Sequence, residues 1–434
     1  MSFLKNTLAG FLKDTNIKYL FSKGLISLGF RVLGVCFSFY TIKLISNFYF
    51  AKVYGTFSLA QTIIQLLCVI LTLGVQNTII VEVNRNIEQK DFSAQNFLFH
   101  VIKLVLFVSI IPVFLIYFFA PQIAIFIFHK TQLTSVFKLI AISLPFFLLH
   151  EIAVYYFIAT KKLILFGWFM FIVPNVLFFT FIFLFRNDSI NAYNIVSFYG
   201  ISFFITLIIE FCFIFFKQIN FSKPQFSYKK TLIASLPMMF SGVMSFLINW
   251  TDVLMLGSFS TEENVGIYNA AFKVGMIVYI IIISMSIVIG PKVTEAYESK
   301  NFSELKKIIQ KATQLITFVT LPIVLLIIIF SEYLLSYFGN AFIAGKTVLI
   351  IIAISTFISA VCGNVDLILN LTNNKKLVFY INIFVFLINL ILNYFLIPTY
   401  GINGSAIASL IATIVLNFTC VYFIKKKFGY YTLI

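Results

Sequence analysis

The chain has 434 residues, of which 61% are hydrophobic and only 11% are charged. A soluble protein of this length has too little interior to bury so much apolar surface, so the composition excludes a soluble domain and indicates an integral membrane protein. The 31 Lys and Arg residues outnumber the 15 Asp and Glu residues and give a net charge of +16. This excess lies mainly in loops, which argues for a signal of membrane orientation and against a nucleic-acid-binding surface.

Apolar runs of membrane-spanning length follow one another along the whole chain. Each must be helical, because short loops join the runs and lipid offers the backbone no hydrogen-bond partner. We therefore predict an all-α integral membrane protein with twelve transmembrane helices. Their approximate ranges are 24–47, 54–80, 97–119, 133–158, 163–185, 192–216, 231–257, 264–290, 312–338, 346–371, 377–398 and 402–424.

The basic residues favour one side of these predicted spans. With the N-terminus in the cytoplasm, the cytoplasmic loops hold most of the Lys and Arg residues, including Lys229, Lys230, Lys306, Lys307 and the run 425–427. Such a bias sets the orientation of a membrane protein. We expect a multi-pass protein with both termini in the cytoplasm. The first span is expected to be retained, because its apolar run is too long for a signal-peptide core.

Polar side chains form stripes on the first two predicted spans. Arg31, Gly34 and Ser38 recur at helical spacing in the first span, and Gln61 and Gln65 share one face of the second. Arginine stays charged, so its side chain needs water, a carboxylate or an anionic ligand. Two interpretations of Arg31 stay open, because the guanidinium either faces a ligand or reaches back to the inner membrane surface.

A second set of charges lies in the inner third of spans three to six. Lys103, Glu151 and Glu210 are placed so that they can form one cluster at the cytoplasmic mouth. Such a cluster would act as a gate, or it would tie the helices together as a static contact. His150 precedes Glu151, but no second ligand stands at zinc-binding spacing, so no metal site is predicted.

The loop 217–230 divides the spans into two halves of six. We take residues 1–216 as an N-terminal lobe, residues 217–230 as a cytoplasmic linker and residues 231–434 as a C-terminal lobe. An internal repeat supports this division, because residues 52–60 (KVYGTFSLA) resemble residues 263–271 (ENVGIYNAA). Two such lobes are related by a pseudo-two-fold axis along the membrane normal, and the substrate site of transporters built in this way lies between the lobes.

The stretch Leu236–Val274 carries the most informative polar residues. Asn249 and Asp252 share a helix face in span seven, and Asn269 and Lys273 lie one turn apart in span eight. Ionisable residues in apolar helices are costly and usually mark a cavity or an ion pair. Asp252 and Lys273 are at similar distances from the loop between the two spans, so we expect them to approach each other. Either a structural ion pair or the wall of a polar transport path would explain them.

Spans ten and eleven add a carboxylate and a row of asparagines. Asp366 lies about two turns before Lys375, and Asn382, Asn389 and Asn393 share one helix face. We expect Asp366 to contribute to a gate or to ion coupling, and Asn389 to line the substrate path.

No group of residues for catalysis stands out. The sequence has no phosphate-cradling glycine loop with its lysine, no HExxH and no GxSxG motif, and its polar loops are too short for a soluble active site. The five cysteines all lie within predicted spans and lack metal-site spacing. We therefore predict a membrane protein that is not an enzyme and that needs no cofactor.

Three motifs resemble those of a known family of membrane proteins. They are Asp252-Val-Leu-Met-Leu-Gly257, Gly266-Ile-Tyr-Asn-Ala-Ala271 and, after Pro398, Gly401-Ile-Asn-Gly404-Ser-Ala-Ile-Ala. Over nearly its whole length the chain resembles the polysaccharide-export flippases, the Wzx-type transporters of O-antigen and capsule repeat units. These transporters form one superfamily with the multidrug-and-toxin (MATE) exporters and the lipid II flippases, so the resemblance implies a MATE-like fold.

The resemblance also implies a function. Members of this family carry undecaprenyl-diphosphate-linked oligosaccharides from the inner to the outer leaflet for lipopolysaccharide O-antigen and related surface polysaccharides, and their central cavity is cationic. We expect the same activity in a bacterial cytoplasmic membrane, by a monomer that works beside a polysaccharide polymerase and chain-length machinery. The expected substrate-binding residues are Arg31, Ser38, Gln61, Gln65, Asn249, Asp252, Asn269, Lys273 and Asn389.

Two other classes of function stay open. A cation-coupled multidrug exporter of the same fold would require acidic residues deep in the N-terminal lobe, whereas Glu151 and Glu210 are expected near the cytoplasmic mouth. A non-transporting scaffold within a polysaccharide-assembly complex is the third class, and the polar stripes in both lobes argue against it. The residues expected at a gate or in ion coupling are Lys103, Glu151, Glu210 and Asp366.

Overall fold

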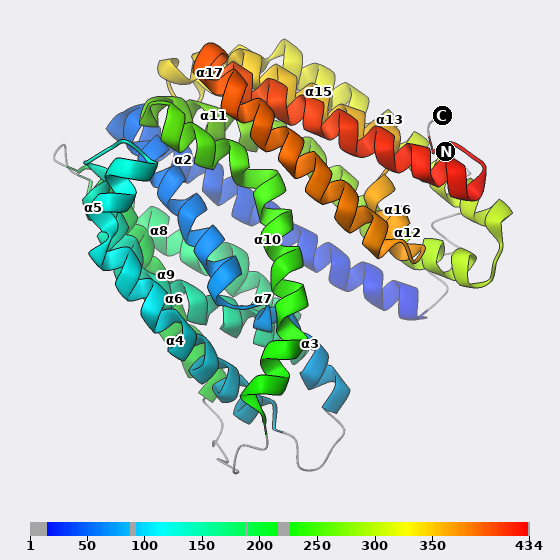
Figure 1. Cartoon of the computed structure of the whole chain (residues 1–434), viewed down its shortest axis with the longest axis horizontal. Coiled ribbons are helices and arrows are strands. Elements are labelled where there is room, and N and C mark those ends of the chain that lie inside the picture. Colours follow the sequence, from blue (N-terminus) through cyan, green and yellow to red (C-terminus); the bar gives the residue numbers. More distant parts are fainter. Residues whose placement is uncertain (1–14, 87–92, 187–189, 216–225, 433–434) are drawn as a thin grey trace.

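The computed structural model describes residues 15–86, 93–186, 190–215 and 226–432. Helices make up nearly all of this part of the chain, and it contains no strand (Figure 1), which confirms the predicted all-α class. The helices before residue 216 are α2 (Thr15–Leu71), α3 (Val75–Asn86), α4 (Ala94–Phe118), α5 (Ala120–Gln122), η1 (Ile123–Ile127), α6 (Leu133–Ala159), α7 (Leu163–Gly167), η2 (Trp168–Ile172), α8 (Val173–Leu184) and α9 (Ala192–Phe215). Those after residue 225 are α10 (Tyr228–Phe259), α11 (Glu262–Gly275), α12 (Ile277–Glu298), α13 (Phe302–Ile329), α14 (Ser331–Ser336), η3 (Asn340–Gly345), α15 (Lys346–Cys362), α16 (Val365–Leu371) and α17 (Lys375–Phe428).

Ten helical segments in the described ranges are long and apolar enough to cross a membrane. Two of these segments lie in α2 and α17, which Figure 1 shows reversing their direction part-way along. α2 leaves helical geometry at Phe50 (φ 65°), and α17 does so at Gly401 (φ 56°). A positive φ is easy for Gly401, which has no Cβ, and is strained for Phe50. Each of these two helices covers two of the predicted spans, which accounts for the difference between ten segments and twelve predicted spans.

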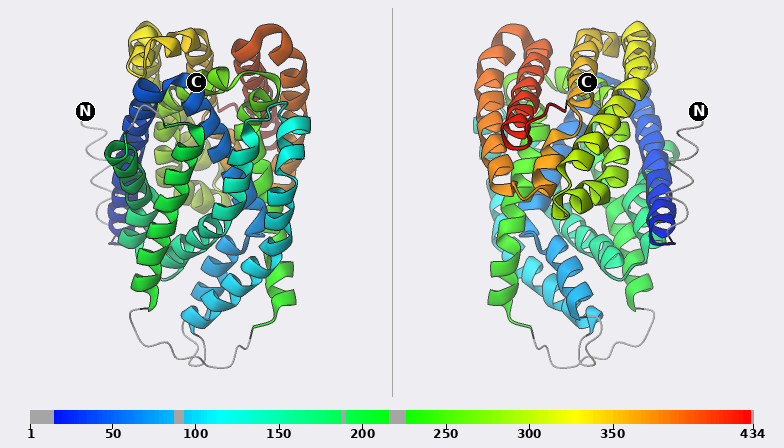
Figure 2. Two further views of the ribbon diagram at one scale, coloured as in Figure 1. Left: turned by 90° about the vertical axis from the view of Figure 1, so that its left-hand side faces the viewer. Right: turned by 90° about the vertical axis from the view of Figure 1, so that its right-hand side faces the viewer.

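The helices form two bundles, each with an apolar core of its own. The first bundle consists of the second arm of α2 with α3, α4, α6, α8 and α9, and its core includes Val101 and Phe157. The second bundle consists of α11 to α17, and its core includes Leu305. A further cluster, with the fully buried Tyr54 and Tyr268, joins the two bundles. Figure 2 shows from two sides how the yellow to red helices of the second bundle group apart from the cyan helices of the first.

The lobe boundaries at residues 216 and 231 stay a prediction, because residues 217–225 of the expected linker lie outside the described residues. The long helix α10, which follows them, packs on both bundles. Near its start, the Tyr228 ring stacks on the His100 ring of α4 at 4.1 Å, and the Thr231 hydroxyl lies 3.2 Å from His100 Nε2. Toward its end, α10 packs against α17 of the second bundle. By its contacts, α10 therefore begins in the first bundle and ends in the second.

At one end of the molecule, which we call the closed end, the bundles meet where α2 crosses α11. A Cβ added to Gly55 would lie 1.6 Å from the carbonyl oxygen of Glu262, and one added to Gly266 would lie 2.5 Å from the carbonyl oxygen of Ala51. The same atom on Gly266 would lie 3.1 Å from the Cα of Gly55. Gly55 and Gly266 are equivalent positions of the internal repeat, and their mutual contact is consistent with the predicted two-fold axis passing between them.

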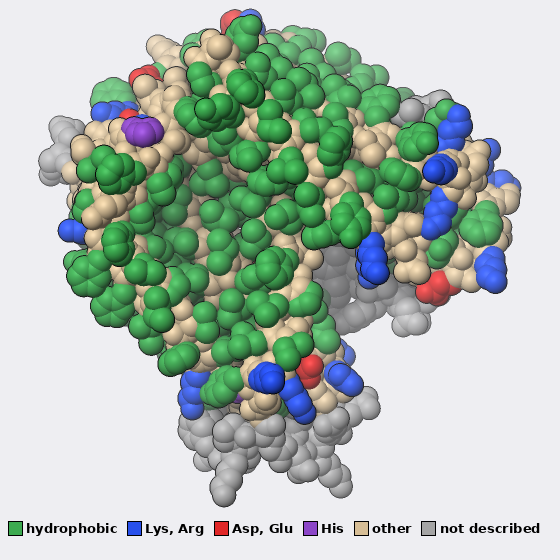
Figure 3. Space-filling model, in the orientation of Figure 1, with side chains coloured by type: hydrophobic (Ala, Val, Ile, Leu, Met, Phe, Trp, Pro, Cys, Tyr) green, Lys and Arg blue, Asp and Glu red, His purple; other side chains and the backbone are tan. Residues whose placement is uncertain are grey.

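At the opposite end, which we call the open end, the two bundles separate. Figures 1 and 3 show the starts of α4 and α10 apart from the ends of α12 and α17, with a hollow between them. Lysine and arginine side chains gather on both sides of this hollow (Figure 3). The exposed basic residues of this end include Arg85, Lys229 and Lys230 on the first side, and Lys306, Lys307, Lys375, Lys376, Lys425, Lys426 and Lys427 on the other.

Candidate functional site

Asp252 is the centre of the most extensive buried polar network among the described residues. The Tyr268 hydroxyl donates to its Oδ2 at 2.7 Å, and the Nδ2 atoms of Asn389 and Asn393 donate to its Oδ1 at 3.3 and 2.8 Å. The Ser409 hydroxyl donates to Oδ2 as well. Burying a carboxylate is costly unless hydrogen bonds compensate for the lost water, and these four donors provide them. The network ties α10 to α11 and to both arms of α17.

The predicted ion pair between Asp252 and Lys273 is not formed. Within the described part of the chain, the side-chain ion pairs join His150 to Glu210 and Lys346 to Glu332. The sequence places Asp252 and Lys273 at similar depth, but helix rotation decides which side chains meet. Tyr268 lies on the face of α11 toward α10 and occupies the place that the prediction gave to Lys273.

Lys273 is half-buried and lies beside the first bundle. Its Nζ is 5.9 Å from the centre of the Tyr54 ring, and the Tyr54 hydroxyl donates to Asn269 Oδ1 at 2.8 Å. Tyr54 and Asn269 are both buried, so this hydrogen bond joins α2 to α11 in the interior. The predicted substrate-binding residue Asn269 is thus a contact between the bundles in this structure, whereas Lys273 keeps an ammonium without an ion-pair partner among the described residues.

Arg31 and Ser38 lie on the first arm of α2, and both are half-buried. The Arg31 guanidinium is 5.7 Å from the centre of the Phe171 ring in η2. Gly34, one turn on, allows this close approach, because a Cβ there would lie 2.9 Å from the Phe171 Cβ. Arg31 therefore sits where α2 packs on η2, and no carboxylate in the described residues pairs with it.

The predicted amides of spans two and seven differ in their surroundings. Gln61 is half-buried and donates from Nε2 to the Tyr199 hydroxyl at 3.2 Å, which ties α2 to α9. Gln65 is half-buried one turn further along α2. Asn249 is exposed on α10 and donates to the Ser245 carbonyl oxygen of its own helix at 2.7 Å. Among the described residues, Gln65 makes no side-chain hydrogen bond and Asn249 bonds only within its own helix, whereas Gln61 is bound to another helix.

The predicted cluster of Lys103, Glu151 and Glu210 forms only in part. Glu210 is fully buried and pairs with His150 Nδ1 at 2.9 Å. Glu151 is half-buried on the same helix as His150 and is near enough for its charge to interact with Glu210. Lys103 is exposed on α4 and makes no ion pair with either acid in the described residues. His150, and not Lys103, is therefore the partner of Glu210 in this cluster.

Asp366 is exposed in the first turn of α16, and the predicted role in a gate stays a prediction. α15 ends at Cys362, and Gly363 and Asn364 both have positive φ, so the helix is broken just before Asp366. In the described residues no group of three or more His, Cys, Asp and Glu side chains is placed to hold a metal ion.

A set of contacts that sequence analysis missed holds the closed end together. Lys130 Nζ donates to the carbonyl oxygens of Gly257 and Ser260 at 2.8 and 2.6 Å, and the Ser258 hydroxyl donates to the Ile127 carbonyl oxygen at 2.6 Å. Gln132 also donates to the Glu262 carboxylate. We call these contacts between residues 127–132 and 257–262 the outer latch. Lysine is favoured at the end of α10, because the last carbonyl groups of a helix lack intrahelical donors.

The sequence carried a signal for some of the missed residues. Tyr268 stands inside the motif 266–271, and Ser405 and Ser409 follow Gly404 one helical turn apart. Ser405 donates to Asn393 Oδ1 at 2.8 Å and thereby orients the Asn393 amide toward Asp252. No sequence signal marks Lys130, because its partners are backbone carbonyl groups.

Two family models together match most of this chain. A model described as polysaccharide biosynthesis protein matches residues 21–296, which is more than half of the chain. The chain belongs to the polysaccharide biosynthesis protein family. A second model, MatE, matches residues 237–395. The family resemblance that the three motifs indicate is thereby confirmed.

Individual relatives are more distant. The "probable low-salt glycan biosynthesis flippase Agl15" of Haloferax volcanii is 26% identical over 192 residues, which cover 44% of this chain and 41% of that protein. The chain therefore matches less than half of the length of this curated relative.

Two solved structures share the fold. The lipid II flippase MurJ in an inward closed conformation has a TM-score of 0.74 at 17% identity, over 93% of this chain and 87% of MurJ. A multidrug resistance MATE family transporter in an inward-facing conformation has a TM-score of 0.71 at 13% identity, over 94% of this chain and 98% of that transporter. Identities this low show the fold alone, and they confirm the MATE-like fold of a multi-pass integral membrane protein.

Proposed function

We propose that this protein is a transporter that flips lipid-linked oligosaccharides, with an undecaprenyl diphosphate carrier, from the inner to the outer leaflet. The observation that carries the proposal is a pair of cations, Arg31 on α2 and Lys273 on α11. Both are half-buried in apolar helices, and neither has an ion-pair partner among the described residues. A cation at membrane depth needs a counter-charge, and a diphosphate that passes between the bundles supplies one.

The shape of the molecule supports the direction of loading. The bundles are latched together at the closed end and separate around a hollow at the open end. The basic residues gather at the open end. Because cytoplasmic loops of membrane proteins are rich in lysine and arginine, we propose that this end faces the cytoplasm of a bacterial cell and that both termini are cytoplasmic. A substrate from the inner leaflet would enter there. In this proposal the protein works as a monomer and passes its cargo toward a polysaccharide polymerase and chain-length machinery.

The experiment that tests the proposal replaces Arg31 and follows a lipid-linked oligosaccharide across the membrane of proteoliposomes. Arg31→Gln is expected to abolish translocation without loss of protein, and Arg31→Lys to restore it poorly, because a guanidinium binds phosphate oxygens through two parallel hydrogen bonds. Arg186→Gln is the matched control, since Arg186 lies outside the spans over the Phe48 ring at 3.9 Å. Full translocation by Arg31→Gln would remove Arg31 from the substrate site.

The orientation has a test of its own. A reporter enzyme fused after residue 260 is expected to give a periplasmic signal, and one fused after residue 225 a cytoplasmic signal. The reverse pattern would reject the direction of transport together with the topology.

A cation-coupled multidrug exporter is the second candidate, because the MatE model matches residues 237–395. Such an exporter requires an acidic site for organic cations. In the first bundle the most buried acid, Glu210, is already paired with His150, and the unpaired charges Arg31 and Lys273 are basic. These observations favour an anionic cargo. Export of organic cations by the purified protein, without translocation of lipid-linked sugar, would support the exporter instead.

A further inference from the structure

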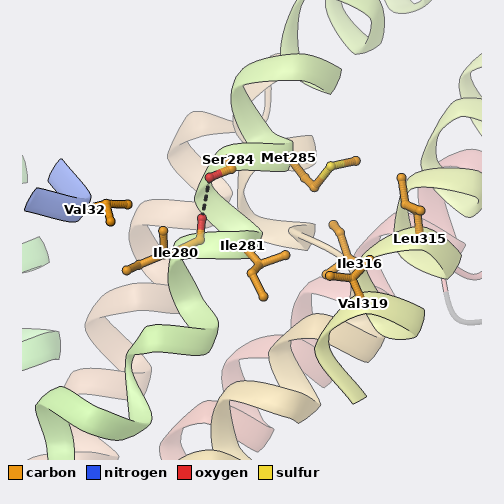
Figure 4. Close-up of a pocket in the computed structure, with 8 residues that line it drawn as sticks. All are labelled: Val32, Ile280, Ile281, Ser284, Met285, Leu315, Ile316 and Val319. Carbon is orange, nitrogen blue, oxygen red and sulfur yellow. Dashed lines mark hydrogen bonds between the residues drawn. The ribbon is translucent and has the colours of Figure 1, made fainter. Parts of the chain in front are cut away.

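An apolar groove of about 320 Å³ lies between α2, α12 and α13. Figure 4 shows Val32 approaching Ile280 of α12 from α2, while Ile281 of α12 points toward Ile316 and Val319 of α13 and Leu315 extends that wall. The groove therefore has one side on the first arm of α2 and the other on the second bundle. It lies at the same helical level as Arg31, the residue before Val32.

The lining of this groove offers nothing to a polar ligand. Ser284 is its one polar side chain, and the Ser284 hydroxyl donates to the Ile280 carbonyl oxygen of its own helix at 2.7 Å (Figure 4). Met285 adds a flexible thioether side chain that adapts to irregular apolar shapes. A volume of this size is at the small end of the range for ligand pockets, so the groove accommodates a stretch of hydrocarbon chain and not a whole lipid.

Arg31 places a charged side chain next to the groove along α2. Consecutive residues of a helix project about 100° apart at nearly the same height. The half-buried Arg31 guanidinium, with no carboxylate partner in the described residues, thus lies around the helix from an apolar groove. This combination of a cation and an adjoining apolar slot is complementary to an amphipathic anion, in which a phosphate is joined directly to a hydrocarbon chain.

We propose that the groove binds the first isoprene units of a polyprenyl phosphate carrier while Arg31 holds its phosphate. This inference rests on the proposed function and deepens it, because it assigns a site to the lipid part of the cargo. A carrier bound in this way touches α2 and the second bundle together. Closure of the open end would bring these two walls toward each other, so the chain has to leave the groove before the bundles complete that movement.

The first test measures binding of undecaprenyl phosphate to the purified full chain in nanodiscs. Val319→Trp is expected to fill the groove and to weaken binding about tenfold or more, since a bound apolar chain loses its contacts. Phe318→Trp is the matched control, because Phe318 neighbours Val319 on α13 but is 79% exposed and outside the groove. Equal weakening by both variants, or by neither, would overturn the proposal.

A second measurement does not depend on the folding of the Trp variants. A photoreactive amino acid in place of Ile281 is expected to cross-link to undecaprenyl phosphate, and one in place of Phe318 is not. Phosphatidylglycerol, an anionic phospholipid, should compete poorly. Equal competition by phosphatidylglycerol would overturn the proposal in favour of a membrane phospholipid site.

The outcomes separate this inference from the proposed function. If the wild-type protein translocates lipid-linked oligosaccharide while Val319→Trp binds undecaprenyl phosphate as tightly as Phe318→Trp, the groove assignment fails and the flippase stands. If the wild-type protein binds the carrier in the groove but translocates no lipid-linked sugar, the proposed function fails and the groove stands.

Discussion

The two ends of the molecule are built from different kinds of contact. At the closed end the bundles touch through backbone atoms, where Gly55 and Gly266 bring α2 against α11 and Lys130 binds the carbonyl groups that end α10. At the open end the bundles carry exposed lysines and arginines on both sides of a hollow. Like charges repel, so the open end has no comparable means of staying shut without an anion between its sides.

This difference shows how a transporter of this kind can favour one state when empty. The outer latch and the glycine crossing stabilise the closed end through close packing and hydrogen bonds, both of which depend on exact fit. The open end depends on charge, which the diphosphate of the proposed cargo would neutralise. Binding of cargo would therefore reduce the charge repulsion at the open end first. The contacts at the closed end would set the free energy needed to separate the bundles there.

The largest effect is expected from Asp252→Ala, which removes the acceptor shared by α10, α11 and α17. Tyr268, Asn389, Asn393 and Ser409 would lose a buried partner, and each unpaired group costs about 1–3 kcal/mol. The protein should unfold at clearly lower temperature in detergent, as thermal unfolding would show. Glu298→Ala is the control, because Glu298 is exposed near the end of α12 and its loss should change stability by about 0.5 kcal/mol or less. Equal melting of both variants would contradict a structural role for the network.

The next effect is expected from Gly266→Ala at the glycine crossing. The new Cβ would meet the Ala51 carbonyl oxygen at 2.5 Å, and overpacking of this kind costs about 1–3 kcal/mol. Because this contact belongs to the closed end, the variant should increase the fraction of molecules in which the two bundles have separated there. Longer spin-label distances between positions 131 and 263 would measure this separation. Gly29→Ala, where no atom lies within 4 Å of the new Cβ, should leave these distances unchanged. A shift of the same size in Gly29→Ala would break the comparison.

A smaller effect is expected when the outer latch loses its lysine. Lys130→Ala removes two hydrogen bonds to the end of α10, worth about 1–2 kcal/mol together. The 131–263 distance distribution should gain a longer component, whereas Lys376→Ala at the open end should leave it as it is. If Lys130→Ala kept the wild-type distribution, the latch would be a passive contact.

The smallest effect is a dependence of the closed end on pH. Burial lowers the pKa of Lys130 from its usual 10.5, and the nearby Glu262 carboxylate partly offsets this. Separation of the bundles at the closed end would expose Lys130 and return its pKa to 10.5. At a pH between the lowered pKa and 10.5, the separated form therefore binds more protons than the packed form, so the packed form gains stability as pH rises toward 10.5. Spin-label distances at pH 7 and pH 10 would reveal this, and Lys130→Met should remove it. Opening of the closed end at higher pH would contradict the sign of the effect.

The sequence was sufficient for the fold but not for the pairing of its polar residues. Hydropathy and charge determine helix positions, because each span must be apolar and its loops must obey the positive-inside rule. The internal repeat even marks Gly55 and Gly266, which the structure brings into contact. Which side chains meet depends on helix rotation, and sequence spacing leaves this free between helices. For that reason Asp252 was expected beside Lys273 and instead binds Tyr268, which lies about one and a half turns earlier on the same helix.

The path of α10 has a consequence for the order in which the protein is made. A ribosome synthesises the first bundle before residue 228, yet the His100 side chain and the turn at Gly74 both contact residues of α10. The first bundle therefore stays incomplete until about the first half of α10 has emerged. If the gene were split between residues 216 and 225 and the two fragments were co-expressed, the second fragment would have to supply a helix that finishes the first. If the chain were instead divided after residue 245, the first fragment would carry the part of α10 that packs on the first bundle. Each bundle should then fold with less help from the other fragment.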